Sequence, residues 1–237
     1  MMFDDDDILI EEILLNNCKP YLTLLKELAR NGIKKPLLRG SAQPYDTLTK
    51  IKVSERPKPM SMDQEDHQIS NAWFKEKFNV AARTETVFVT TSRGLASNYG
   101  LIHYVFPIGK FSIINSNKYT DLFLEMGWMQ KANIYKKKFG VPEGYDLETY
   151  KGDKKFLETY KGVKKFLEDV KTENPSKYKE IVTTILENGD YEKNNFKEAF
   201  RNGNEIMLKC NAFYIISEED DRIKDFINDF IWDDIFI

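Results

Sequence analysis

The 237-residue chain is poor in cysteine and histidine, with two of each. Cys18 and Cys210 lie far apart, which is typical of reduced, unpaired thiols rather than of a disulfide framework. The spacing of cysteines and acidic residues around His67 and His103 does not make a zinc site, so we expect no metal site. A glycine-rich phosphate-binding loop is also missing, which argues against Rossmann-type and nucleotide-hydrolase folds.

Long apolar runs and a strong net charge are absent too. No stretch approaches the roughly 18 apolar residues that a membrane span requires, and the acidic start, residues 1–7, is unlike a signal peptide. We therefore expect a soluble, cytoplasmic protein with no membrane partner. The net charge of -3 disfavours nucleic acid as the main partner, because it provides no broad positive field. The lysine-rich segment 151–165 leaves a local basic face open, although a solvated helix surface is the simpler interpretation.

The hydrophobic content of 41%, with 13% aromatic residues, is enough for a substantial core. We expect one domain spanning residues 1–237. Apolar residues recur at helical spacing over residues 8–30, with a break near Pro20, which predicts helices in the N-terminal segment 1–34. The same spacing predicts a helix over residues 66–78.

Short apolar runs bounded by glycine, proline and polar residues predict strands. These runs cover residues 36–40, 86–90, 101–106, 110–115 and 205–216. A short helix is expected over 94–99. Pro107-Ile108-Gly109 separates two of the runs and indicates a hairpin or a tight corner. The polar, proline-containing segment 41–66 favours an extended loop.

Residues 117–200 have helix-like stretches and almost no strand pattern, so we expect a helical insertion there. Within it, the decamer LETYKGDKKF at 147–156 is followed by LETYKGVKKF at 157–166, which indicates a local duplication. Ten residues is close to three helical turns, so the apolar stripe stays roughly in phase. Two copies are too few for a solenoid.

Three short motifs at the ends of predicted strands contain charged or hydroxyl side chains. They are Leu37-Leu38-Arg39-Gly40, Val87-Phe88-Val89-Thr90-Thr91-Ser92, and Glu205 with the apolar run that follows it. Each motif alone has a structural explanation. Arg39 would form an ordinary ion pair, the hydroxyls would cap a strand end, and Glu205 would simply begin a strand.

Taken in order, the motifs resemble the arginine, hydroxyl and glutamate elements of mono-ADP-ribosyltransferases of the Arg-Ser-Glu type. The resemblance covers residues 35–116 and 200–217. It implies an α+β fold with a split, mostly antiparallel sheet, NAD as substrate in the cleft between its halves, and transfer of ADP-ribose to a macromolecule. The run 101–123 is similar to uncharacterised bacteriophage-encoded members of the superfamily, which implies a phage source and a host protein as acceptor.

The resemblance also implies roles for individual residues. Arg39, followed by Gly40, would grip the dinucleotide, because a guanidinium offers planar donors to phosphate oxygens. Thr90 replaces the first serine of a Ser-Thr-Ser element and would orient the catalytic glutamate. Glu205 is the expected catalytic residue, since its carboxylate can accept a hydrogen bond from a ribose hydroxyl and stabilise positive charge on the sugar.

Four further residues are expected to contact NAD. Thr91 and Ser92 complete the hydroxyl element of the resemblance. Tyr99 is expected to stack on nicotinamide, with helix packing as its alternative role, and Phe111 is a second candidate for stacking.

Two departures from the family pattern leave alternatives open. Many arginine-modifying members have a glutamate where this chain has Gly203, which argues against arginine as the acceptor. Thr90 adds a methyl group at the serine position. A catalytically silent interaction protein of the same fold, binding a host protein or DNA, is therefore a second hypothesis. A third is NAD hydrolysis without an acceptor, or 2'-phosphate transfer from RNA.

Overall fold

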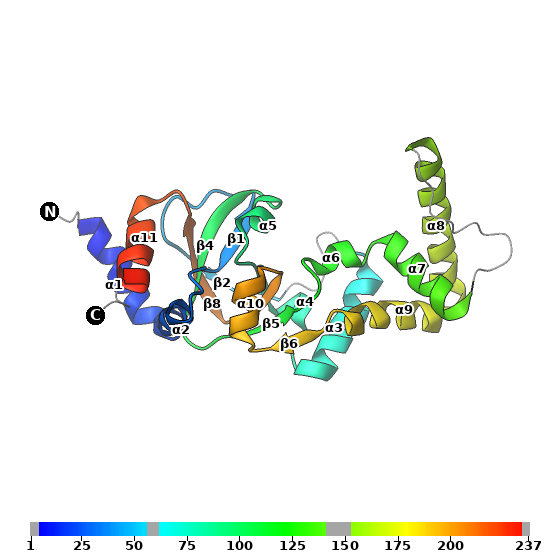
Figure 1. Cartoon of the computed structure of the whole chain (residues 1–237), viewed down its shortest axis with the longest axis horizontal. Coiled ribbons are helices and arrows are strands. Elements are labelled where there is room, and N and C mark those ends of the chain that lie inside the picture. The colour runs from blue at the N-terminus through cyan, green and yellow to red at the C-terminus, as the bar shows by residue number, and fades with distance from the viewer. Residues whose placement is uncertain (1–4, 56–61, 141–152, 234–237) are drawn as a thin grey trace. The chain divides into compact units, whose positions relative to one another are not determined.

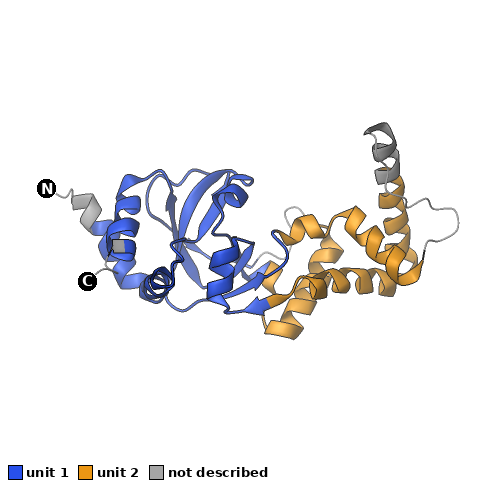
Figure 2. Cartoon of the chain, viewed as in Figure 1, with its two compact units in different colours: residues 1–56, 84–120, 192–237 blue, residues 57–83, 121–191 orange. Residues whose placement is uncertain are grey.

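The structure is a computed structural model that describes residues 5–55, 62–140 and 153–233. The chain forms two compact units, coloured separately in Figure 2. Unit 1 contains Met1–Arg56, Thr84–Thr120 and Glu192–Ile237, and unit 2 contains Pro57–Arg83 and Asp121–Tyr191. Two antiparallel sheets and several helices confirm the predicted α+β class.

The N-terminal helices of unit 1 are α1 (Asp5–Asn17) and α2 (Lys19–Arg30), which confirms the prediction for residues 8–30. The break lies at Cys18, and Pro20 stands in the first turn of α2, where a backbone N–H is not needed for the helix ladder. Both helices contribute buried leucines to the core of unit 1. In Figure 1 they lie with α11 beside β4 and β8.

The first sheet of unit 1 has the strand order β1-β4-β8-β2. Its strands are β1 (Leu38–Ser41), β4 (Leu101–Pro107), β8 (Ala212–Ser217) and β2 (Thr49–Lys52). β2 lies in the segment predicted to be an extended loop. It is a short edge strand whose Lys50 and Lys52 are exposed, so its sequence has no buried apolar run that would distinguish it from a loop.

The second sheet has the order β3-β7-β5-β6. Its strands are β3 (Val87–Val89), β7 (Ile206–Lys209), β5 (Ser112–Ser116) and β6 (Tyr191–Lys193). Since β4 and β5 belong to different sheets, the hairpin interpretation of their connection is wrong, and the chain turns a corner between them. Gly109 has φ +66 at this corner, a conformation that glycine adopts without strain.

The remaining elements of unit 1 are short. They are α5 (Arg93–Ser97), α10 (Phe196–Asn202), α11 (Asp221–Asp225) and a π-helix η1 (Phe226–Asp233), while α4 (Ala82–Glu85) bridges the sequence boundary of the two units. The residues of η1 that are described, with α2 beside them, complete the core of unit 1.

The regular elements in the described part of unit 2 are helices, apart from the first residue of β6. Its helices are α3 (Gln64–Phe78), α6 (Leu122–Glu125), α7 (Trp128–Phe139), α8 (Asp153–Glu173) and α9 (Pro175–Asn188). α3 confirms the helix predicted over 66–78. The segment predicted as a helical insertion, 117–200, supplies α6 to α9, and the segment 57–83 joins it to form the unit.

The first copy of the decamer lies mostly outside the described residues. In the second copy, which belongs to α8, Val163 and Phe166 are buried while Lys161, Lys164 and Lys165 are exposed. These three lysines therefore lie on the solvated face of an amphipathic helix.

A buried polar cluster joins three helices of unit 2. Lys131 on α7 forms an ion pair with Asp66 on α3 and donates to the hydroxyl of Tyr178 on α9, at 3.0 Å. Tyr178 in turn donates to Asp66 at 2.9 Å. Burial raises the pKa of Asp66, and the charge of Lys131 opposes that shift. The three groups satisfy one another in the interior, as buried charges require.

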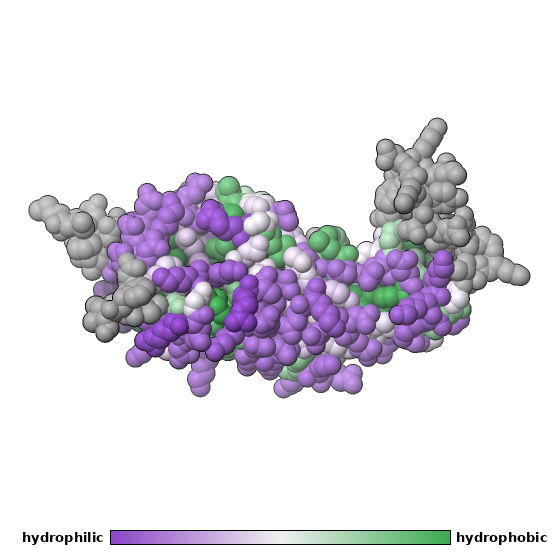
Figure 3. Space-filling view, in the orientation of Figure 1, coloured by the Kyte–Doolittle hydropathy of each residue, from purple (hydrophilic) through white to green (hydrophobic). Residues whose placement is uncertain are grey.

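Hydrophilic residues dominate the face drawn in Figure 3, with apolar patches among them. One such patch lies over α6, where Phe123 and Leu124 are exposed. Among the described helices, none combines the length and the hydropathy needed to cross a membrane.

Candidate functional site

The three predicted motifs lie on neighbouring strands of unit 1. β3 pairs with β7 so that Val89 stands opposite Ile206. Because the strands are antiparallel, Thr90, which follows Val89, and Glu205, which precedes Ile206, lie at the same end of this pair. On its other side Thr90 forms an isolated bridge with Leu38, through backbone hydrogen bonds of 2.7 and 2.9 Å. The strands of Glu205, Thr90 and Arg39 are therefore consecutive, and they meet where the two sheets split.

Arg39 lies one residue beyond the bridge, on β1. Its Nη1 donates to the carbonyl oxygen of Phe88 at 3.1 Å, so the guanidinium reaches across the split to β3. Burial lowers the pKa of Arg39, and the nearby Tyr45 acts in the opposite direction. A guanidinium keeps its charge at neutral pH even so. The side chain is half-buried, which leaves N–H donors for a ligand.

The hydroxyl of Thr90 is buried and makes two hydrogen bonds within the fold. It donates to the carbonyl oxygen of Gly203 at 2.7 Å and accepts from the backbone N–H of Ser92 at 3.0 Å. Because its proton is directed at Gly203, the hydroxyl does not donate to the Glu205 carboxylate. Thr90 instead fixes the backbone that leads into Glu205.

Thr91 and Ser92 also bond to the fold. The Thr91 hydroxyl donates to the carbonyl oxygen of Phe200 at 3.0 Å, and the Ser92 hydroxyl accepts from the N–H of Leu95 at 3.2 Å as the N-cap of α5. Both residues connect the end of β3 to the neighbouring helices α10 and α5.

Glu205 lies immediately before β7 and is half-buried, and its backbone N–H donates to the carbonyl oxygen of Thr120 at 2.8 Å. Gly203 ends α10 with φ +74, and a Cβ atom added there would lie 3.2 Å from Cβ of Ser92. A glutamate at position 203 would thus be strained. The backbone here therefore disfavours a second carboxylate two residues before Glu205.

The structure also brings Gly40 and Tyr99 together. A Cβ atom added to Gly40 would lie 2.0 Å from the carbonyl oxygen of Ala96 and 2.8 Å from Cβ of Tyr99. Only glycine allows the end of α5 to approach β1 this closely. Tyr99 is 52% exposed, so an aromatic ring lies near the surface beside the arginine motif.

Phe111 is placed apart from these residues. Its ring packs edge-on against Tyr21 and Phe196, with centroids 5.9 and 5.7 Å away. It therefore contributes to packing between α2 and the start of α10.

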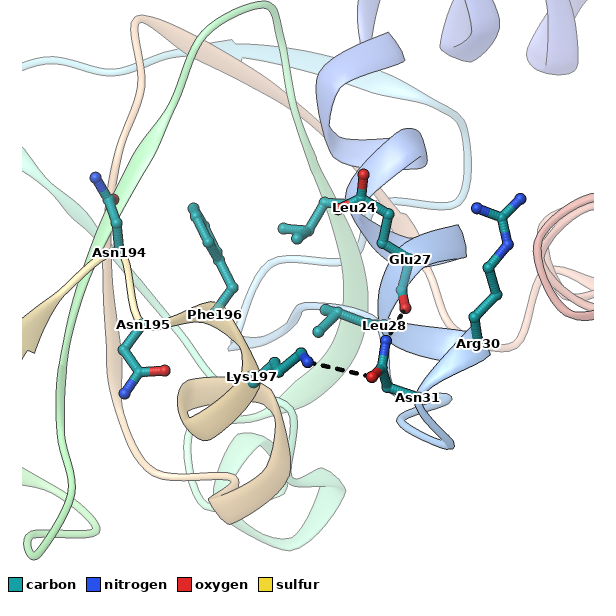
Figure 4. A pocket seen from close by; sticks show the side chains of 9 residues that line it. All are labelled: Leu24, Glu27, Leu28, Arg30, Asn31, Asn194, Asn195, Phe196 and Lys197. Carbon is teal, nitrogen blue, oxygen red and sulfur yellow. Dashed lines mark hydrogen bonds between the residues drawn. The ribbon is translucent and has the colours of Figure 1, made fainter.

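A surface hollow of about 500 Å³ lies next to this packing, between α2 and the segment 194–197. In Figure 4, Leu24 and Leu28 face Phe196 across it, and Lys197 donates to Asn31 at 3.1 Å on its rim. None of the predicted site residues, all of which the structure describes, lines this hollow.

One ion pair beside the site was not anticipated from the sequence. Arg93, the first residue of α5, pairs with Glu218, which follows β8, through two contacts of 3.0 Å. The contact from Nη2 to Oε1 is a hydrogen bond and the one from Nη1 to Oε2 is a charge contact, and together they link α5 to the end of β8. The two residues are far apart in the chain, and no local pattern links them.

Comparisons of the chain with protein-family models, curated proteins and solved structures gave no match.

Proposed function

We propose that the chain is an NAD-dependent mono-ADP-ribosyltransferase that modifies a macromolecule, with a host protein as the expected acceptor. One observation supports this most strongly. Glu205, Thr90 and Arg39 lie at the ends or edges of three consecutive strands, where an antiparallel sheet splits into two halves. A split sheet with these groups at the split is what the resemblance implies for NAD binding.

In the proposed reaction, Arg39, Glu205 and Tyr99 each have one role. Arg39 binds the pyrophosphate with the donors that Phe88 does not use. Glu205 accepts a hydrogen bond from the nicotinamide ribose and stabilises the positive charge that develops as the bond from C1' to nicotinamide breaks. Nicotinamide leaves with the bonding electron pair, and the acceptor forms a bond to C1' and loses a proton. Tyr99 stacks on the nicotinamide ring.

Gly203 limits the choice of acceptor. In the family, a carboxylate at this position would help to activate the weakly nucleophilic guanidinium of an arginine acceptor. In this chain the left-handed backbone of Gly203 disfavours a side chain there. We therefore propose an acceptor group other than arginine.

A transfer assay tests the proposal. The purified protein is mixed with labelled NAD and host lysate, and label incorporated into macromolecules is measured. Glu205→Gln should abolish labelling while the protein keeps its fold by circular dichroism. The matched control Glu198→Gln changes a half-buried glutamate on α10 that pairs with Arg201, and it should label at the wild-type level. Equal labelling by Glu205→Gln would refute the catalytic assignment.

A catalytically silent interaction protein of this fold is the second candidate. The hydrogen bonds of Thr90, Thr91 and Ser92 favour it, because they give the whole hydroxyl motif a structural role. A binding-only protein of this fold need not bind NAD, so calorimetric titration with NAD separates the two candidates. Release of free nicotinamide without any protein acceptor would instead identify an NAD hydrolase.

A further inference from the structure

A row of polar side chains crosses the first sheet from Arg39. On β4, His103 stands directly opposite Arg39, and on β8, Ser217 stands directly opposite His103. Residues that face each other across antiparallel strands project from the same face of the sheet. Arg39, His103 and Ser217 therefore share one face, and the row leads away from Thr90 and Glu205.

His103 has an unused nitrogen in the interior. The residue is 1% exposed, and its Nδ1 has no hydrogen-bond partner among the described residues. A buried polar atom without a partner is costly and is rare in folded proteins. A water molecule or a ligand hydroxyl would satisfy such an atom, and its place beside the proposed nucleotide site makes it a candidate ligand contact.

Tyr45 covers His103. The two rings meet edge-to-face with centroids 5.2 Å apart, and the backbone carbonyl of Tyr45 accepts from the N–H of Ser217 at 2.7 Å. Tyr45 is half-buried in the irregular segment that follows β1, and its hydroxyl donates to the side chain of Gln43 at 3.2 Å. An aromatic ring close to Arg39 is thus held against the sheet and is partly open to solvent.

We propose that Tyr45 and His103 bind the adenosine end of a dinucleotide, Tyr45 by stacking on adenine and His103 Nδ1 by a hydrogen bond to a ribose hydroxyl. This inference rests on the proposed function. If Arg39 holds the pyrophosphate and Glu205 the nicotinamide ribose, the order of the strands directs the other half of the ligand over β4 and β8, where this row lies.

The chemistry of both contacts fits adenosine. Adenine offers a flat ring, and bases stack favourably on aromatic side chains. A hydroxyl can donate or accept, so it satisfies Nδ1 in either neutral tautomer of the imidazole, whereas a phosphate oxygen can only accept. Because the ring of Tyr45 covers His103 edge-on, it must turn before the Nδ1 atom of His103 can contact the ligand.

Calorimetric titration with four ligands tests the inference: NAD, ADP-ribose, AMP and nicotinamide mononucleotide. Tyr45→Ala should weaken AMP and ADP-ribose binding about tenfold or more and leave nicotinamide mononucleotide binding unchanged. Tyr45→Phe, which keeps the ring, should bind all four ligands as the wild type does.

His103 needs variants that separate binding from folding. His103→Leu removes the unpaired nitrogen, so it should unfold at the same temperature as the wild type or higher, yet bind AMP more weakly. His103→Asn retains a polar atom near the position of Nδ1 and should restore much of the AMP affinity. Lower stability of His103→Leu with unchanged AMP binding would show a purely structural histidine.

The outcomes separate the two proposals. A wild-type protein that binds no NAD overturns both. A protein that binds NAD and labels lysate, but whose affinity for AMP is unchanged in Tyr45→Ala and His103→Leu, overturns only the adenosine subsite. Equal weakening of AMP and nicotinamide mononucleotide would also refute it, because the contacts would not be specific to one end.

Discussion

Two glycines determine how the site is built at the scale of single residues. Gly40 lets α5 approach β1, and Gly203 turns the chain from α10 into Glu205. At Gly40 the constraint is one of space, and at Gly203 it is mainly the left-handed backbone. The sequence shows both glycines, but the atoms that make Gly40 necessary belong to Ala96 and Tyr99, more than 50 positions further along the chain.

Gly40→Ala should therefore destabilise the protein by about 1–3 kcal/mol or more, because the new methyl group overlaps the Ala96 carbonyl. The free energy of unfolding from urea denaturation measures this. Gly162→Ala is the matched control, since Gly162 lies in α8 with open space around its Cβ position, and it should stabilise the helix by up to about 1 kcal/mol. No difference between the two variants would contradict the packing role of Gly40.

Asp63 should make stability pH-dependent. It caps α3 by accepting from the N–H of Glu65 at 2.9 Å, and it pairs with Lys171 at 2.9 Å. Burial by itself would raise the pKa of Asp63, but the Lys171 and backbone hydrogen bonds outweigh it and lower the pKa. This stabilisation is fully present above the unfolded pKa, about 3.9, and is lost as the pH falls through the folded value.

Asp63→Asn, which keeps the cap but not the charge, should flatten the dependence of unfolding free energy on pH below about pH 4. Urea denaturation at a series of pH values measures the slope. The same slope in wild type and variant would show that Asp63 does not contribute.

At the scale of elements, the cluster of Asp66, Lys131 and Tyr178 ties α3, α7 and α9 together. Lys131→Met leaves a buried carboxylate without its counter-ion and should cost about 3–5 kcal/mol. The double variant Lys131→Met with Asp66→Asn removes both charges and should recover much of that loss. The account of this cluster fails if the single variant unfolds at the wild-type urea concentration.

An element can be predicted from the sequence when the pattern that specifies it lies within the element itself. α1, α2 and α3 were predicted because the apolar face of a helix repeats within the segment itself. β2 and the division of β4 and β5 between two sheets depend on distant partners, and no local pattern specifies them. The order of the arginine, hydroxyl and glutamate motifs was visible, whereas the hydrogen bond from Thr90 to Gly203 spans residues 113 apart.

At the scale of the whole molecule, the proposed site belongs to unit 1, and unit 2 has its own helices and polar cluster. Saturating NAD should therefore slow amide hydrogen exchange in β1, β3 and β7, since ligand binding lowers the population of opened states. Exchange in α9, buried within unit 2, should be unchanged. If NAD slowed exchange only in α9, the ligand would bind unit 2, which would contradict a site in unit 1.

We propose that NAD binds at the split between the two sheets and is held there by Arg39. Calorimetric titration of the wild-type protein and of Arg39→Gln with NAD tests it most directly. We expect saturable binding of one NAD by the wild type and at least about tenfold weaker binding by the variant, which keeps hydrogen-bond donors but loses the charge and the bidentate geometry. No binding by the wild type, or equal affinity in the two proteins, would contradict it.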